Sequence, residues 1–539
     1  MSVDAREGPT GHGAARRLGL AWSAAIFATA LSLRLAYLPT AGADPTFLHP
    51  YLDALWNLQH ASAVAGGQLA ATQPFYRAPL YTYFLAGLLV LTGGSLLRVH
   101  LAQLVLGSLT AVLVGALGAR LAGRRVGILA GLLYAGTATV LFFDCELLNA
   151  VVFVPLAVVT LLALESVTRE PSLRRFLLMG LALGVAALAR PDILAFAPVA
   201  AALAVGAARR AGWRGLRLLA GAGLVGAGAA IAIAPATLHN AIAGRDRVLI
   251  SSQGGAIFYV CNNPDADGLA PLMPGPTDTA SYAADGTYTD NIESASRFLA
   301  RRALGHEPRP SEVSRYWSRR AVAWIAADPG AWARLALRKA LHLIGGFEVG
   351  DQKNLAYFLA TWWPFAFLPR WWWLLPLALA SLTFPGDRRT RVILGSFALV
   401  YGATLVAFVP VERFRLALYP ALCILAAVFL VAATAAVGAG RWRGVALRLA
   451  FAGALVAVTT SDLTGYTLPE RTAAAVARAS DSEGRGDDAR AERLLVDALA
   501  ADPGSARGRA AYADFLERHG RHAEARALSD ARPPGAITP

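Results

Sequence analysis

An aspartate, Asp53, follows the first long apolar stretch of the chain, and Arg77 comes next in an Arg-Ala-Pro turn that leads into an aromatic, apolar run, residues 78–96. Ionisable side chains at the edge of a bilayer are costly, and by default they indicate a functional site. A carboxylate in this setting predicts a general base that takes a proton from an acceptor while a lipid-borne group is transferred to it. The simpler alternative is that Asp53 caps a helix.

The elements that must position these groups are membrane-spanning helices. Of the 539 residues, 56% are hydrophobic and 16% are charged, and the mean hydropathy is +0.46, which is unusual for a soluble globular protein. The sequence therefore predicts an all-α polytopic membrane protein with about 11 transmembrane helices. The expected spans are roughly 19–39, 97–119, 125–143, 148–166, 174–189, 193–208, 216–237, 367–384, 390–410, 416–437 and 444–464.

Arginine clusters between these spans predict the orientation, because short loops rich in Lys and Arg stay on the cytoplasmic side. The clusters all fall on one side if the run 78–96 is an interfacial helix rather than a span. They are Arg16/Arg17, Arg120/Arg124/Arg125, Arg169/Arg174/Arg175, Arg209/Arg210/Arg214/Arg217, Arg388/Arg389/Arg391 and Arg441/Arg443/Arg448. The net charge of +14 then reflects topology, and no nucleic-acid partner is predicted.

The chain divides into four parts. Residues 1–237 are expected to form an N-terminal transmembrane module with a catalytic first outer loop, 40–96. Residues 238–366 should form a periplasmic loop region, where ISSQGGAIFYVCNNPDADG carries the alternation and turn signals of a mixed, globular-like fold. Residues 367–466 supply the C-terminal transmembrane helices. The tail 467–539 has a faint repeat of about 34 residues, which indicates tetratricopeptide-like hairpins or an unrelated helical tail.

Several kinds of site are not indicated. The chain has no phosphate-cradling Gly-Lys-Ser/Thr loop. Its three cysteines and scattered histidines lack metal-ligand spacing, so no metal site is predicted from spacing. The N-terminal apolar stretch is longer than a secretory signal and contains Arg34, which favours a retained anchor. Because the number of spans is odd, the tail should lie on the outer face.

The chain resembles the membrane glycosyltransferases with the C-type fold, and within them the bacterial family-39 enzymes related to protein O-mannosyltransferases and lipid A aminoarabinose transferase. The similarity rests on LDALWNLQHASAVAGGQ, PFYRAPLYTYFLAGLL, ALARPDILAF, FEVGDQKNLAYF and ERFRLALYP, and covers roughly residues 15–440. The resemblance implies a polyprenyl-phosphate sugar donor and inversion on the outer face. It also leaves a divalent metal open, because some relatives bind one near their carboxylates.

The resemblance assigns roles to individual residues. Asp53 takes the place of the catalytic aspartate, but Ala54 stands where relatives often have a second acid. Glu146, or else Asp144, is the candidate for that second carboxylate. The candidates for binding the donor phosphate, by charge-assisted bonds to its oxygens, are Arg77, Arg190, Arg413, Arg415 and Lys339. The candidates for the acceptor or sugar pocket are Tyr76, Tyr259, Asn262, Asn263, Glu348 and Asn354.

The sequence thus predicts an enzyme of the bacterial inner membrane that moves a sugar from polyprenyl phosphate to a periplasmic glycan, lipid or protein, with its active site and C-terminus on the periplasmic face. The tail is a candidate surface for a protein partner. Two other classes remain as alternatives: a transporter or flippase of lipid-linked saccharides, and a non-catalytic assembly scaffold. Against a transporter, the sequence shows no internal duplication, and its polar residues cluster at the outer edge.

Overall fold

The computed structural model describes residues 18–68, 72–269, 291–347, 350, 353, 355–465, 467–484 and 486–530. All secondary structure in these ranges is helical, as the composition predicts. Nine helical segments there are long and apolar enough to cross a membrane. They are α2 (Leu20–Gly42), α5 (Leu96–Ala122), α8 (Ala150–Arg169), η2 with α10 (Pro191–Arg210), α11 (Leu216–Ile242), the segment Trp363–Thr383 around α17 (Trp371–Ala380), α18 (Arg388–Ala407), α19 with α20 (Glu412–Gly438) and α21 (Trp442–Thr460).

Two further elements complete the eleven expected positions. Helices α6 (Arg124–Ala135) and α7 (Ala138–Asp144) count as one broken span, bent by 59°. Helix α9 (Leu173–Ala189) has 17 residues and packs between α8 and α11. Its glycines allow this close approach, because a Cβ on Gly180 would lie 2.2 Å from the carbonyl oxygen of Val225 in α11. Small residues spaced four apart, such as Gly180 and Gly184, commonly pack membrane helices in this way.

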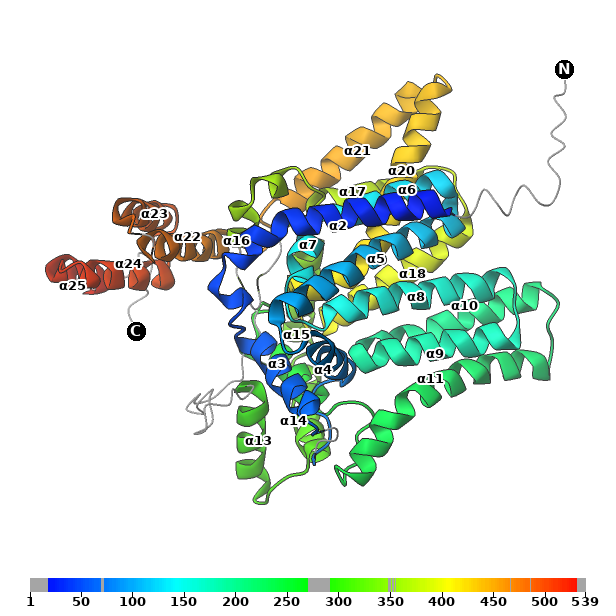
Figure 1. Ribbon diagram of the computed structural model, residues 1–539, viewed down its shortest axis with the longest axis horizontal. Helices are drawn as coiled ribbons and strands as arrows, with labels where there is room; N and C mark the ends of the chain where they lie inside the picture. The colour runs from blue at the N-terminus through cyan, green and yellow to red at the C-terminus, as the bar shows by residue number, and fades with distance from the viewer. Residues whose placement is uncertain are drawn as a thin grey trace.

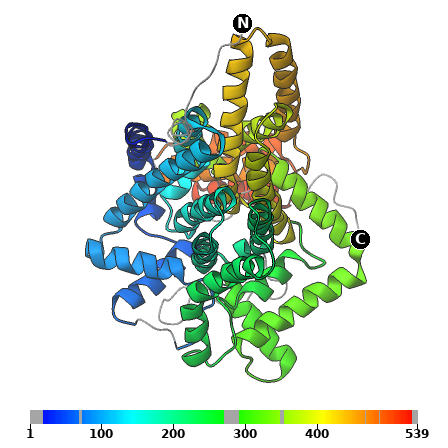
Figure 2. The same cartoon turned by 90° about the vertical axis from the view of Figure 1, so that its right-hand side faces the viewer.

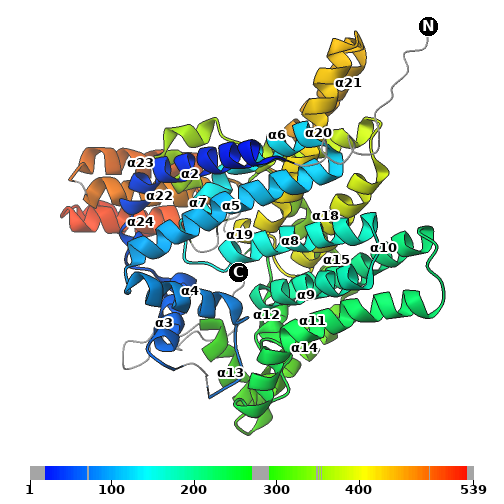
Figure 3. The ribbon, with the colours of Figure 1, turned by 45° about the vertical axis from the view of Figure 1, so that its right-hand side comes forward.

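The bundle has two distinct ends (Figure 1). The turns that follow α5, α8, α10 and α17, with their arginine clusters, lie together at the right in this view. At the opposite end, which we call the site end, lie α3 (Leu52–Ala65) and α4 (Leu80–Thr92) (Figure 3). Helix α4 has 13 residues and is therefore about 20 Å long, too short to cross a bilayer. This length agrees with the interfacial position expected for the run 78–96.

The region 238–366 is helical in its described residues and has no strand there, which corrects the expectation of a mixed fold. Its helices are α12 (Gly254–Cys261), α13 (Asn291–Leu304), α14 (Pro310–Ala327), α15 (Pro329–Ile344) and α16 (Leu355–Thr361). A short apolar run such as the one in α12 does not distinguish strand from helix by its pattern. Helix α12 packs closely against α14 at Gly255, where a Cβ would lie 1.8 Å from the Ser314 carbonyl oxygen.

The tail lies beyond α21 at the site end (Figures 1 and 3). Helices α22 (Thr467–Gly484) and α23 (Asp488–Ala501) pack as one pair, and α24 (Ala506–Arg518) and α25 (His522–Asp530) as a second. Helix α22 contacts α16, so the tail is joined to the outer helices. Seen along the bundle in Figure 2, several of the spanning helices appear nearly end-on.

Candidate functional site

Asp53 lies between two guanidinium groups at the site end. Its Oδ1 accepts a hydrogen bond from Nη2 of Arg77 at 2.6 Å, and its Oδ2 accepts one from Nη1 of Arg413 at 2.5 Å. The three side chains are only 14–17% exposed. They come from the start of α3, the turn before α4, and α19 (Glu412–Arg415), so the fold brings together groups that are 360 residues apart.

Local structure constrains Asp53 and Arg77. Leu52, immediately before Asp53, has φ 51°, a left-handed conformation that non-glycine residues rarely adopt. The turn carrying Arg77 is held from outside, because the side-chain oxygen of Asn240 accepts the Phe75 amide and the carbonyl of Tyr76 accepts the Gln253 amide. Strained backbone of this kind persists where the surroundings impose it, often at functional sites.

Aromatic rings support the arginines. The guanidinium carbon of Arg77 lies 4.5 Å from the ring centroid of Trp56. Arg413 lies 4.7 Å from Phe414, and Arg190 lies 4.1 Å from the same ring. Arg190 thereby joins the cluster, and its charge is paired with Asp192 at 2.5 Å. Three of the predicted phosphate-binding residues, Arg77, Arg190 and Arg413, are therefore neighbours.

The charges around Asp53 favour its ionised form. Burial acts to raise the pKa of the carboxyl, but Arg77 and Arg413 outweigh burial and hold the pKa well below its usual range. A carboxylate held this firmly is a weak proton acceptor, because basicity falls with pKa. In this state Asp53 is an anion held by two cations, Arg77 and Arg413.

Glu146 belongs to a second cluster at the same end. Lys353 Nζ donates to Oε1 of Glu146 at 2.7 Å and to Oδ2 of Asp44 at 2.9 Å, and all three side chains are at most 14% exposed. Burial raises the pKa of Glu146, and the ammonium of Lys353 opposes this shift only in part. For Asp44, burial is outweighed by Lys353, and the pKa is lowered.

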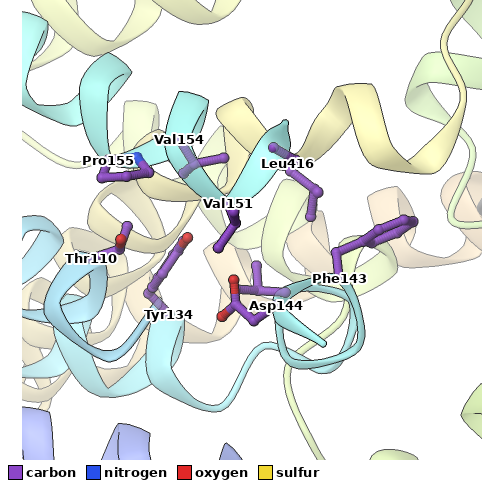
Figure 4. Close-up of a pocket in the computed structure, with 10 residues that line it drawn as sticks. Thr110, Tyr134, Phe143, Asp144, Val151, Val154, Pro155 and Leu416 are labelled. Atoms are coloured by element: carbon purple, nitrogen blue, oxygen red, sulfur yellow. The ribbon is translucent and has the colours of Figure 1, made fainter. Parts of the chain in front are cut away.

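Asp144 does not point to the same place as Glu146. Its Oδ2 accepts hydrogen bonds from Nε and Nη2 of Arg34, at 2.9 and 2.6 Å, in the interior of the bundle. It also lines a small pocket with Tyr134 and Thr110, in which Figure 4 shows the side chains of Asp144 and Tyr134 facing the same space. Gly107 makes room for the carboxylate, because a Cβ there would lie 2.2 Å from Oδ2.

Two of the predicted phosphate-binding residues instead hold backbone. Arg415 is fully buried and donates to the carbonyl oxygens of Pro410, Gly345 and His342. Lys339 donates to the carbonyl of Cys261 at 2.6 Å, and burial lowers its pKa to about 8. Both side chains therefore anchor the loops and helices on which the cluster rests.

The predicted pocket residues fall into two groups. Tyr76 lies beside Arg77 in the turn before α4, whereas Tyr259 packs against Trp317 between α12 and α14. Asn262 and Asn263 bond to the backbone around the end of α12. Glu348 and Asn354 lie outside the described residues.

The described side chains do not fit a divalent metal site. No group of three His, Cys, Asp or Glu residues that could hold an ion occurs among them. The carboxylates at the site end are instead matched with cations of the protein: Asp53 with two arginines, and Asp44 and Glu146 with Lys353.

Lys353 and Asp44 were not predicted from the sequence as site residues, and neither was the pairing of Arg34. The composition could have drawn attention to Lys353. Lys339 and Lys353 are the only two lysines among the 50 Lys and Arg residues of the chain, and both are largely buried. A chain that uses arginine almost everywhere places lysine where a compact ammonium is needed. Arg34 was noted within a span, but only the fold could supply its partner.

Residues 76–239 match the model of the family described as dolichyl-phosphate-mannose-protein mannosyltransferase. The match includes Arg77, Glu146 and Arg190, whereas Asp53 and Arg413 lie outside it. It covers less than a third of the 539 residues. None of the curated proteins matches the chain.

Among solved structures, similarity extends to the oligosaccharyltransferase AglB from the archaeon Archaeoglobus fulgidus, in complex with an inhibitory peptide and a dolichol-phosphate, at 12% identity and a TM-score of 0.39. The apo form of the Archaeoglobus fulgidus oligosaccharyltransferase gives 12% identity and a TM-score of 0.41. Each comparison covers 82% of this chain and 55% of the other, so the chain spans about half the length of these structures. Likeness at this level is too weak to assign an activity.

Residues 76–239 thus carry the signature of the dolichyl-phosphate-mannose-protein mannosyltransferases, and together with the polytopic helical fold this match supports the C-type membrane glycosyltransferase that the sequence resemblance implied.

Proposed function

We propose that this protein transfers a sugar from a polyprenyl-phosphate donor to an acceptor hydroxyl, with inversion at the anomeric carbon and with Asp53 as general base. The observation that carries the proposal is the position of Asp53 between Arg77 and Arg413, at the end of the bundle away from the basic loops. One carboxylate and several guanidiniums are the groups that such a transfer requires.

The chemistry uses these groups in one displacement. The acceptor oxygen forms a bond to the anomeric carbon while its proton passes to the Asp53 carboxylate. The bond between that carbon and the phosphate oxygen breaks, and the electron pair leaves with the lipid phosphate. Arg77 and Arg413, with Arg190 beside them, stabilise the negative charge that develops on the leaving phosphate. No nucleotide is needed, because the lipid phosphate already activates the sugar.

The remaining predicted residues have supporting roles in this proposal. Glu146, paired with Lys353, belongs to the second cluster at this end, and Arg415 and Lys339 hold the backbone that carries Arg413 and α12. The positive-inside pattern favours an outward orientation of this end, which in a bacterium would be the periplasmic face of the inner membrane. The acceptor is then a periplasmic glycan, lipid or protein.

The test compares wild type with Asp53→Asn, reconstituted in liposomes with a labelled polyprenyl-phosphate sugar and a panel of acceptors. Loss of at least about a hundredfold in transfer is expected, because the proton acceptor is gone. Asp497→Asn, an exposed residue of the tail, is the matched control and should transfer normally. Full activity of Asp53→Asn would discard Asp53 as the base, and movement of intact donor across the bilayer without transfer would favour a transporter.

A further inference from the structure

The guanidinium groups that hold Asp53 are the same groups that the proposed function assigns to the donor phosphate. Each oxygen of Asp53 accepts from a different arginine, at 2.6 and 2.5 Å. Arginine presents the same planar fork of donors to carboxylate and to phosphate, so the two anions are interchangeable partners for it. A phosphate that reaches Arg77 and Arg413 must therefore compete with Asp53 or share the arginines with it.

We propose that a lipid-linked phosphate takes Arg77 and Arg413 away from Asp53, so that binding of the donor itself releases the carboxylate to act as a base. This inference rests on the proposed function and adds to it a way in which donor binding regulates the base. Without donor, the arginines keep Asp53 a poor proton acceptor, and an acceptor hydroxyl meets no active base. With donor bound, the same arginines stabilise the leaving group and Asp53 is free.

The charge of the donor also favours the exchange. Arg77 and Arg413 both pair with the carboxylate of Asp53, whereas Arg190 pairs with Asp192. A sugar linked to a polyprenyl phosphate is a phosphodiester with one negative charge, so it can replace the Asp53 carboxylate as an anionic partner of the two arginines. The released lipid phosphate is a monoester with a charge of about −1.5 to −2 near neutral pH, so it should bind at least as well.

The geometry allows the exchange without a large movement. Arg77 and Arg413 each rest against an aromatic ring, Trp56 and Phe414, which can keep the guanidinium planes in place while their hydrogen-bond partner changes. Asp53 lies in the first turn of α3, so the exchange requires a change in its side-chain torsions and no displacement of the helix. Each of the three side chains is partly open to solvent, at 14–17%.

The experiment measures the affinity of the reconstituted full-length protein for polyprenyl phosphate, a ligand without a transferable sugar. Asp53→Asn should bind it about tenfold more tightly than wild type or better, because the competing carboxylate is gone. Asp53→Ala is a second variant with the same expectation. Asp44→Asn is the matched control: it removes one negative charge from the same end, but from Lys353 instead of an arginine, and should leave the affinity within about twofold.

Equal or weaker binding by the Asp53 variants, with Tm values like wild type, would overturn the exchange. So would an equal gain in Asp44→Asn, which would show a general effect of charge. A competition titration with inorganic phosphate shows whether the lipid contributes to binding. Displacement of bound polyprenyl phosphate indicates a site that binds the phosphate group alone, and no displacement indicates a site that also requires the lipid. If wild type transfers sugar but the Asp53 variants gain no affinity, only this inference fails. If wild type neither transfers sugar nor binds polyprenyl phosphate, the proposed function fails.

Discussion

At the scale of single residues, the carboxylates of this protein differ through their partners. Asp53 has two arginines, Asp144 has Arg34, and Glu146 shares Lys353 with Asp44. Of these four carboxylates, Asp53 is the one that pairs with two cations of the protein. All four residues carry a carboxylate, so it is the charged partners around each one that decide which carboxylate is suited to catalysis beside a phosphate.

Leu52 provides a prediction at this scale, because its φ of 51° stores roughly 1 kcal/mol or more of strain next to Asp53. Asn tolerates this conformation better than Leu, and the β-branched Ile tolerates it worse. We expect Leu52→Asn to keep transfer within about threefold of wild type and Leu52→Ile to lose about tenfold or more. Initial rates at saturating donor provide the measurement, and equal rates for both variants would show that the backbone here is unimportant.

At the scale of elements, a buried ion pair ties two helices together. Arg34 of α2 is fully buried and bonds to Asp144 at the end of α7, two residues before Glu146. Gly107 of α5 leaves the space for this pair. Charged side chains inside a bundle are stable only when they are paired with an opposite charge, and removing one partner leaves the other as an uncompensated buried charge. The pair thus holds the bend between α6 and α7 and, with it, the position of Glu146.

We therefore expect Arg34→Met alone to destabilise the protein by about 3–5 kcal/mol, because Asp144 is left buried without its cation. Arg34→Met with Asp144→Leu should recover most of that loss, since a matched apolar pair replaces the ion pair. Gly107→Ala should also destabilise, because its Cβ would lie 2.2 Å from Oδ2 of Asp144. Thermal unfolding in detergent measures all three. A double variant no more stable than Arg34→Met would contradict the pairing argument.

At the scale of the whole molecule, the two ends of the bundle differ in chemistry. One end collects the turns that follow α5, α8, α10 and α17, and the other collects α3, α4 and the tail (Figure 1). This arrangement agrees with the orientation that the arginine pattern predicts. The tail is joined to the outer helices through α16 and α22, so it shares the side on which we propose transfer.

Cysteine labelling tests this orientation. The native cysteines Cys145, Cys261 and Cys423 are buried, so an introduced exposed cysteine can be followed alone. In intact spheroplasts a membrane-impermeant maleimide should label Asp497→Cys in the tail, but label Ala211→Cys in a basic turn only after lysis. The reverse pattern would invert the proposed topology. Labelling of both before lysis would mean that the two ends do not lie on opposite sides.

The sequence by itself determined the helical fold and the places of its long apolar helices, because apolar length is a local property of the chain. It also singled out Asp53, Arg77, Arg190 and Arg413, which the fold brings together. Its prediction of a mixed fold in region 238–366 was wrong for the described residues, because the pattern of a short apolar run does not distinguish a strand from a helix such as α12.

Only the tertiary structure decided which partner each charged side chain binds. Arg415 and Arg413 are two residues apart and equally basic, yet Arg413 reaches Asp53 while Arg415 turns inward to backbone carbonyls. Asp144 and Glu146 are likewise two residues apart and have different partners, Arg34 and Lys353. The physical reason is that pairing depends on distances across the bundle, between segments more than 100 residues apart, and spacing along the chain carries no record of them.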